Sequence, residues 1–81
     1  MISNEQMKDN LIRVYSKYLE NQKDERNKKD SYKIYLEYST GANAVFDKKV
    51  SSAVWSSFEL SEGKLSIDEA KKILEDLRRT E

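Results

Sequence analysis

The apolar residues in the first quarter of the chain follow the period of one helical face. Residues at spacings of three and four make up this face, which consists of Met7, Leu11, Val14, Tyr15, Tyr18 and Leu19. Ser3 and Gln6 have the spacing of a capping box, in which each side chain bonds the backbone amide of the other residue. The pattern predicts a helix that starts after Ser3 and stops before Asn21, where the apolar stripe ends.

The next ten residues, "NQKDERNKKD", are all polar and mix charges of both signs. Runs of this kind usually form a solvated segment. The basic residues Lys23, Arg26, Lys28 and Lys29 would make a phosphate-binding cluster, but three acidic residues lie among them and argue against it. We therefore expect a polar connection at about residues 21–30.

The segment "SYKIYLEYST" fits two structures. An alternation of apolar and polar residues favours a half-buried strand, with Tyr32, Ile34, Leu36 and Tyr38 as its apolar members. A cap at Asp30 or Ser31 and a stop at Gly41 favour a helix instead. A strand needs a partner, and only the short "NAVF" follows nearby. We predict a helix, with a short hairpin around residues 32–46 as the alternative.

Two more helices follow. The third is predicted at about residues 44–59, with an apolar face made of Phe46, Val50, Ala53, Val54 and Phe58. Trp55 lies beside this stripe, where a tryptophan either seals the rim of a core or serves as an exposed anchor for a partner. Gly63 is expected to turn the chain. Ser66 and Glu69 then have capping-box spacing before a last helix, whose apolar face is Ile67, Ala70, Ile73, Leu74 and Leu77.

These elements predict an all-α fold, a compact domain of three or four helices, with a small α+β arrangement as the alternative. A chain of 81 residues has enough apolar surface for one core, so residues 1–81 are expected to form a single domain. Hydrophobic and charged residues each make up 37% of the chain, which leaves a small core. Self-association into a homo-oligomer would add stability to such a core, so both a monomer and a homo-oligomer remain open.

The composition excludes several kinds of catalytic and metal site. The chain has no cysteine and no histidine, which removes thiolate nucleophiles and the commonest general base and zinc ligand. Fifteen basic and fifteen acidic residues cancel, so no net field attracts nucleic acid or anionic lipid. No secretory signal and no apolar run of about 20 residues is visible, so we expect a cytoplasmic protein without a membrane segment.

The stretch "LSEGKLSIDEAKKIL" resembles the last half of an EF-hand calcium loop. With Gly63 at the sixth place of such a loop, Glu69 falls at the twelfth. Phe58 and Leu60 then occupy the first and third places, where the loop requires oxygen ligands. We expect no calcium site here, and no metal, cofactor or enzymatic activity anywhere in the chain.

The chain has five tyrosines, more aromatic side chains than one small core needs. One interpretation is that most of the five tyrosines cover a small core with their hydroxyls in water. The other is that some of them bind a protein, since tyrosine is enriched at interfaces. We predict a partner-binding surface made of Tyr32, Tyr35, Tyr38 and Trp55.

The expected function is that of a small non-enzymatic inhibitor or regulator that covers a surface of another protein. A bias towards Lys, Asn, Ser and Ile without proline suggests a bacterium, phage or mobile element as the source. A helical bundle of the bacteriocin-immunity type is one alternative. A DNA-binding transcriptional regulator, with a helix-turn-helix in its last two helices, is another. Nucleic acid is the weaker choice of partner, because the leading turn "IDEA" would repel phosphate.

Overall fold

A computed structural model describes residues 3–41 and 46–79 and contains, within these ranges, four helices and no strand. They are α1 (Asn4–Glu20), α2 (Glu25–Gly41), α3 (Lys48–Ser61) and α4 (Ile67–Arg78). The compact all-α prediction is confirmed, with a radius of gyration of 11.5 Å. The strand alternative is excluded for residues 32–41, which are helical, while residues 42–45 of the proposed hairpin lie outside the described residues.

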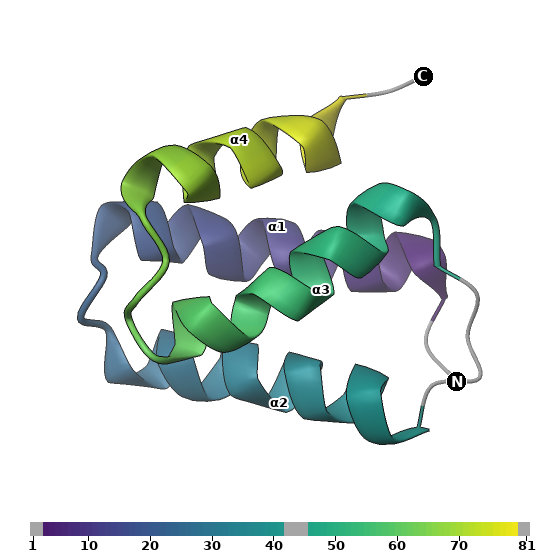
Figure 1. The fold of residues 1–81 in the computed structure, drawn as a ribbon, viewed down its shortest axis with the longest axis horizontal. Helices are drawn as coiled ribbons and strands as arrows, with labels where there is room; N and C mark the ends of the chain where they lie inside the picture. Colours follow the sequence, from purple (N-terminus) through teal and green to yellow (C-terminus); the bar gives the residue numbers. More distant parts are fainter. Residues whose placement is uncertain (1–2, 42–45, 80–81) are drawn as a thin grey trace.

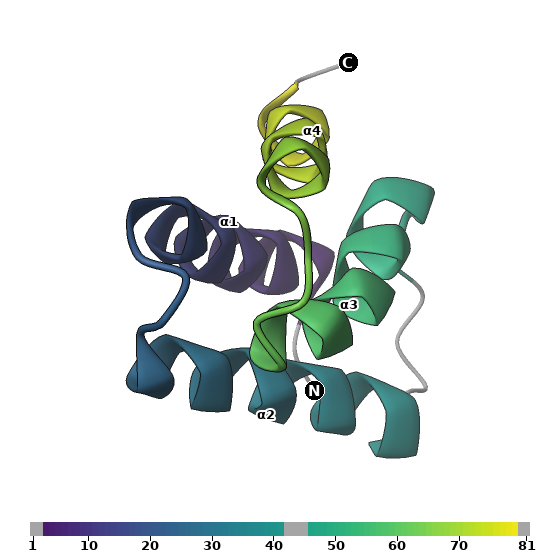
Figure 2. The same ribbon diagram turned by 60° about the vertical axis from the view of Figure 1, so that its left-hand side comes forward.

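The helices pack in three levels (Figure 1). α1 and α3 occupy the middle, α2 packs against both from one side, and α4 packs against both from the other. Among the described residues, α2 and α4 make no contact with each other, which the turned view shows as well (Figure 2). α2 therefore keeps a long outer face that no other described helix covers.

Helix α1 begins as predicted. The Ser3 hydroxyl accepts a hydrogen bond from the Gln6 backbone amide at 3.1 Å, and the Gln6 side chain accepts one from the Ser3 amide at 3.0 Å. At the other end, the Gln22 side-chain amide donates to the Tyr18 carbonyl at 2.7 Å, so it satisfies a carbonyl of the last turn.

The predicted connection at 21–30 is too long. α2 already begins at Glu25, because Asp24 supplies the cap that the sequence pattern assigned to Asp30 or Ser31. Its carboxylate accepts a hydrogen bond from the Asn27 backbone amide at 3.1 Å. The second half of the polar run at residues 21–30 thus forms the first turns of α2, and the connection between α1 and α2 comprises only residues 21–24.

Two polar residues in these first turns are buried, and one of them bonds α1. Asn27 is 2% exposed, and its side-chain amide donates to the Val14 carbonyl at 2.8 Å. Ser31 is fully buried, and its hydroxyl donates to the Asn27 carbonyl within α2 at 2.9 Å. Both side chains thus find a hydrogen-bond acceptor in the interior, whereas the side-chain oxygen of Asn27 has no partner.

Helix α3 starts later than the predicted residue 44. Its cap is Asp47, whose carboxylate accepts from the Val50 amide at 2.9 Å, and this hydrogen bond holds the pKa of Asp47 below its usual range. Asn4 bonds Asp47 in both directions, at 3.1 and 3.0 Å. The first turns of α1 and α3 are thereby tied together, while residues 44 and 45 lie outside the described part of the chain.

The stretch that resembled a calcium loop is a pair of helix caps. Phe58 and Leu60 belong to α3, and Gly63 ends that helix with a φ of 73°. The amides of Gly63 and Lys64 bond back to the Leu60 and Glu59 carbonyls, each at 2.9 Å, which is the Schellman arrangement. The Ser66 hydroxyl then accepts from the Glu69 amide at 3.1 Å and starts α4 as predicted.

The core contains both tyrosines of α1. Tyr15 is fully buried and its hydroxyl donates to the Ala53 carbonyl of α3 at 2.7 Å. Tyr18 is 1% exposed and donates to the Leu65 carbonyl, just before α4, at 2.6 Å. These hydroxyls end on protein carbonyls and do not reach water. The other large buried side chains are Met7, Leu11, Val14, Val50, Val54, Leu60 and Leu77.

Replacing Gly63 by alanine should destabilise the domain. A Cβ at this position would need a φ that L-residues rarely adopt and would lie 3.3 Å from the side chain of Lys28. We expect Gly63→Ala to lower the free energy of unfolding by about 1–2 kcal/mol in urea titrations. The exposed neighbour Lys64→Ala is the control and should cost no more than about 0.5 kcal/mol. Equal unfolding midpoints for the two variants would contradict the assigned turn.

Alkaline pH should also unfold the protein. Burial raises the pKa of the Tyr15 hydroxyl, and the negative charges of Glu59 and Glu69 act in the same direction. The unfolded chain loses this proton above about pH 10 whereas the folded chain keeps it, so stability falls as the pH rises, by up to about 1.4 kcal/mol per pH unit.

The control for this effect is Tyr15→Phe, which removes the proton but keeps the ring. Urea titrations at about pH 9 and about pH 11 should show a smaller loss of stability in the variant than in the wild type. Identical losses in both proteins would mean that Tyr15 ionises as freely in the folded state as in the unfolded state.

Candidate protein-interaction surface

Helices α2 and α3 lie side by side and bring six aromatic rings together. We call this group the aromatic face. Its members are Tyr32, Tyr35 and Tyr38 from α2, Phe46 just before α3, and Trp55 and Phe58 from α3. On α2 the tyrosines recur every three residues, so they drift slowly around the helix while staying on the side towards α3.

The rings contact one another in a continuous series. Phe58 lies between Tyr32 and Tyr35, with centroid distances of 6.3 and 5.0 Å. Trp55 meets Tyr35 at 5.7 Å and Tyr38 at 5.6 Å, with its ring plane turned by 72° and 88°. These edge-to-face contacts are favourable for aromatic pairs because the positive edge of one ring meets the negative face of the other. They hold Trp55 in a defined position.

The aromatic face joins the core at one end and carries exposed rings elsewhere. Tyr38 and Phe46 stack at 5.3 Å and pack against the core. Trp55, which meets Tyr38, is 53% exposed, Tyr32 and Phe58 are 45% and 37% exposed, and beside them Leu36 is 38% exposed. The end formed by Tyr32 and Phe58 is therefore open to solvent, and so is Trp55 beside the inner end.

All four residues predicted to bind a partner belong to this surface. Trp55 was assigned either to the rim of the core or to an exposed anchor, and the structure leaves more than half of its surface in solvent. Tyr35 contacts both Trp55 and Phe58 and so joins the two helices.

Phe58 was misassigned by the sequence pattern, which placed it on the buried face of its helix. Leu60 fills the core at this level instead, with no exposed surface. Phe58 follows Trp55 by three residues, so the two share one face of α3, and this spacing was the signal that would have found it.

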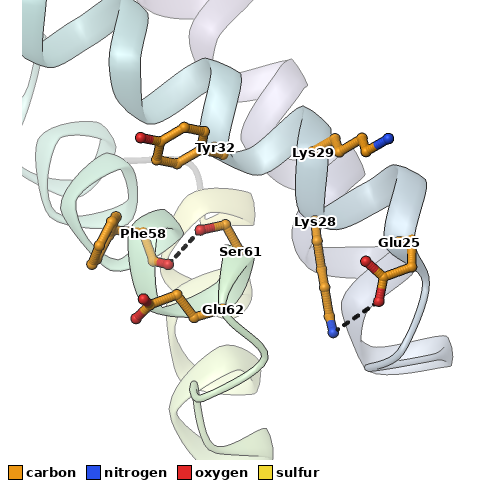
Figure 3. Close-up of a pocket in the computed structure, with 7 residues that line it drawn as sticks. All are labelled: Glu25, Lys28, Lys29, Tyr32, Phe58, Ser61 and Glu62. Carbon is orange, nitrogen blue, oxygen red and sulfur yellow. Dashed lines mark hydrogen bonds and ion pairs between the residues drawn. The ribbon is translucent and has the colours of Figure 1, made fainter.

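A shallow hollow of about 480 Å³ borders the open end of the aromatic face (Figure 3). Tyr32 and Phe58 flank it from the two helices, and the close-up shows Lys28 directed towards Glu25 with its ammonium 3.4 Å from the carboxylate. Lys29 extends away from the hollow. The hollow thus has an apolar wall, made of the two rings, next to a charged pair.

The described residues contain no cluster of three or more histidine, cysteine or acidic side chains that could hold a metal ion. Over the same residues, every helix is too short or too polar to cross a bilayer.

Comparison with known proteins found no matching family model, no matching curated protein and no matching solved structure.

Truncation of Trp55 should cost less stability than truncation of a core side chain. Because this residue is 53% exposed but its ring meets two tyrosine rings, we expect Trp55→Ala to cost about 1–2 kcal/mol of unfolding free energy. Leu60→Ala, in the same helix but fully buried, should cost about 2–5 kcal/mol. Chemical denaturation followed by circular dichroism measures both. A loss for Trp55→Ala as large as that for Leu60→Ala would assign Trp55 to the core.

Proposed function

We propose that this protein is a non-enzymatic inhibitor or regulator that acts by covering a surface of a partner protein with its aromatic face. The observation that carries the proposal is the set of exposed apolar side chains around Trp55, which the fold does not need for its own core. The proposal keeps the expected setting, the cytoplasm of a bacterium or of a cell that carries a phage or mobile element.

The chemistry of the surface supports a protein partner. Tryptophan and tyrosine dominate binding hot spots because they bury a large rigid area and still offer a hydrogen-bond group. The exposed Trp55 and Tyr32 combine these properties, and ring contacts with Tyr35 and Phe58 already hold them in place in the free protein. Less conformational entropy is then lost on binding.

The hollow beside Tyr32 and Phe58 adds a means of selection. A partner that inserts a large side chain there would gain contact with both rings and would meet the Lys28–Glu25 pair at the edge. A flat apolar surface discriminates poorly, whereas a hollow with charged groups at its rim favours a partner of matching shape.

Affinity capture from a lysate of the native host tests the proposal. Two single substitutions on the aromatic face, Trp55→Ala and Tyr32→Ala, should each lower the recovered partner by at least about tenfold, as hot-spot truncations do. Lys71→Ala and Glu75→Ala, on the exposed side of α4, are the controls and should bind as well as wild type.

Circular dichroism first establishes that each variant is folded. If both aromatic variants retain wild-type recovery of a partner that the unmodified protein captures specifically, the aromatic face is not the binding surface. If the two α4 variants lose the partner instead, the binding surface lies on the opposite side of the molecule.

A further inference from the structure

The aromatic face has two charged edges. Along α2, Lys29, Lys33 and Glu37 follow one another at intervals of four residues, and all three are exposed. Along α3, Lys48 and Glu59 are exposed and share the side of the helix that carries Trp55, since they lie seven residues before it and four residues after it. The exposed rings lie between these edges.

The order of the charges is opposite on the two edges. The contact of Tyr32 with Phe58, and of the Tyr38 hydroxyl with Ser51 at 3.4 Å, shows that α2 and α3 run antiparallel and sets their register. Lys33 is then nearly level with Glu59. Further along, Glu37 lies towards the end of the face where α3 begins with Lys48.

We propose that the aromatic face also binds a second copy of this chain, in a two-fold dimer. The two-fold axis lies in the plane of contact, parallel to α2 and α3 and midway between them. This rotation places α2 over α3 of the partner subunit. Lys33 then meets Glu59 of the partner subunit, and Glu37 approaches Lys48 of the partner subunit. Two-fold symmetry forms each of these pairs twice.

Charge complementarity is the reason to choose a second copy as the occupant. The formal net charge of the chain is zero, so two copies approach without long-range repulsion. Each edge carries both signs, which gives no preference for a strongly acidic or strongly basic surface. A surface with the same charges in the opposite order fits best, and the same face of another copy provides it.

This dimer goes beyond the proposed function and competes with it. The dimer covers Trp55 and Tyr32, so a chain in the dimer cannot present these residues to another protein. Because the face spans only two short helices, the dimer is expected to be weak, with a Kd on the order of 1–100 μM. Dilution or a tighter-binding partner then releases the aromatic face.

Sedimentation of the full chain across roughly 1 μM to 1 mM tests the proposal. The wild type should change from the 9.5 kDa monomer to a dimer as its concentration rises. Lys33→Glu makes its edge acidic and Glu59→Lys makes the other edge basic, and each should raise the Kd by about tenfold, since two rim pairs become repulsive. Trp55→Ala should weaken the dimer at least as much.

The decisive step is to combine the two reversals. An equimolar mixture of the Lys33→Glu and Glu59→Lys proteins restores both pairs in a heterodimer, and the double variant restores them in a homodimer. Both should regain a Kd close to that of the wild type.

A monomer throughout the concentration range would overturn the proposal, and so would a dimer that tolerates both reversals or one that the mixture fails to restore. None of these results touches the proposed function, which is measured separately by capture of a different protein.

Discussion

Two buried phenolic hydroxyls of α1 fix the positions on which the rest of the fold depends. Tyr15 bonds the Ala53 carbonyl in α3, and Tyr18 bonds the Leu65 carbonyl that precedes α4. A buried hydroxyl without a partner is costly, so each tyrosine reaches its position only if the neighbouring element is also in place. α2 is held to the same helix through Asn27, which bonds the Val14 carbonyl. α1 is thus hydrogen-bonded through buried side chains to α2, to α3 and to the segment that leads into α4.

This arrangement divides the aromatic residues into two groups with different roles. The tyrosines of α1 are buried in the core, whereas those of α2 contact Trp55 and Phe58 of α3 on the outside. α2 makes its most extensive helix contact with α3, so the direct packing of these two helices sets the register that brings the outer rings together. α4 packs on the opposite side and does not reach α2, so it leaves this face uncovered in the described part of the chain. The exposed aromatic surface follows from this arrangement of α2, α3 and α4.

Local signals in the sequence predicted the caps at Ser3 and Ser66 and the turn at Gly63. The caps at Asp24 and Asp47 have the same three-residue spacing to the amides that they bond, but the sequence pattern did not assign them. The start of α2 was missed because Asn27 and Ser31 are polar, although both are buried once α2 packs against α1.

The candidate site shows the same limit. An excess of aromatic residues could be counted in the sequence, and it singled out Tyr32, Tyr35, Tyr38 and Trp55. Phe58 joins them because of the rotation of α3 against α2, and its three-residue spacing from Trp55 was the local signal of this. Leu60 fills the place in the core that the apolar pattern assigned to Phe58. The candidate surface therefore requires that Trp55 lie in solvent. Trp55 is the single tryptophan of the chain, so acrylamide quenching of its fluorescence in dilute, folded protein measures its exposure. An exposed Trp55 should give red-shifted emission and quenching that approaches that of the urea-unfolded chain. Blue-shifted emission with strong protection from acrylamide would mean that Trp55 is buried and that the aromatic face is closed.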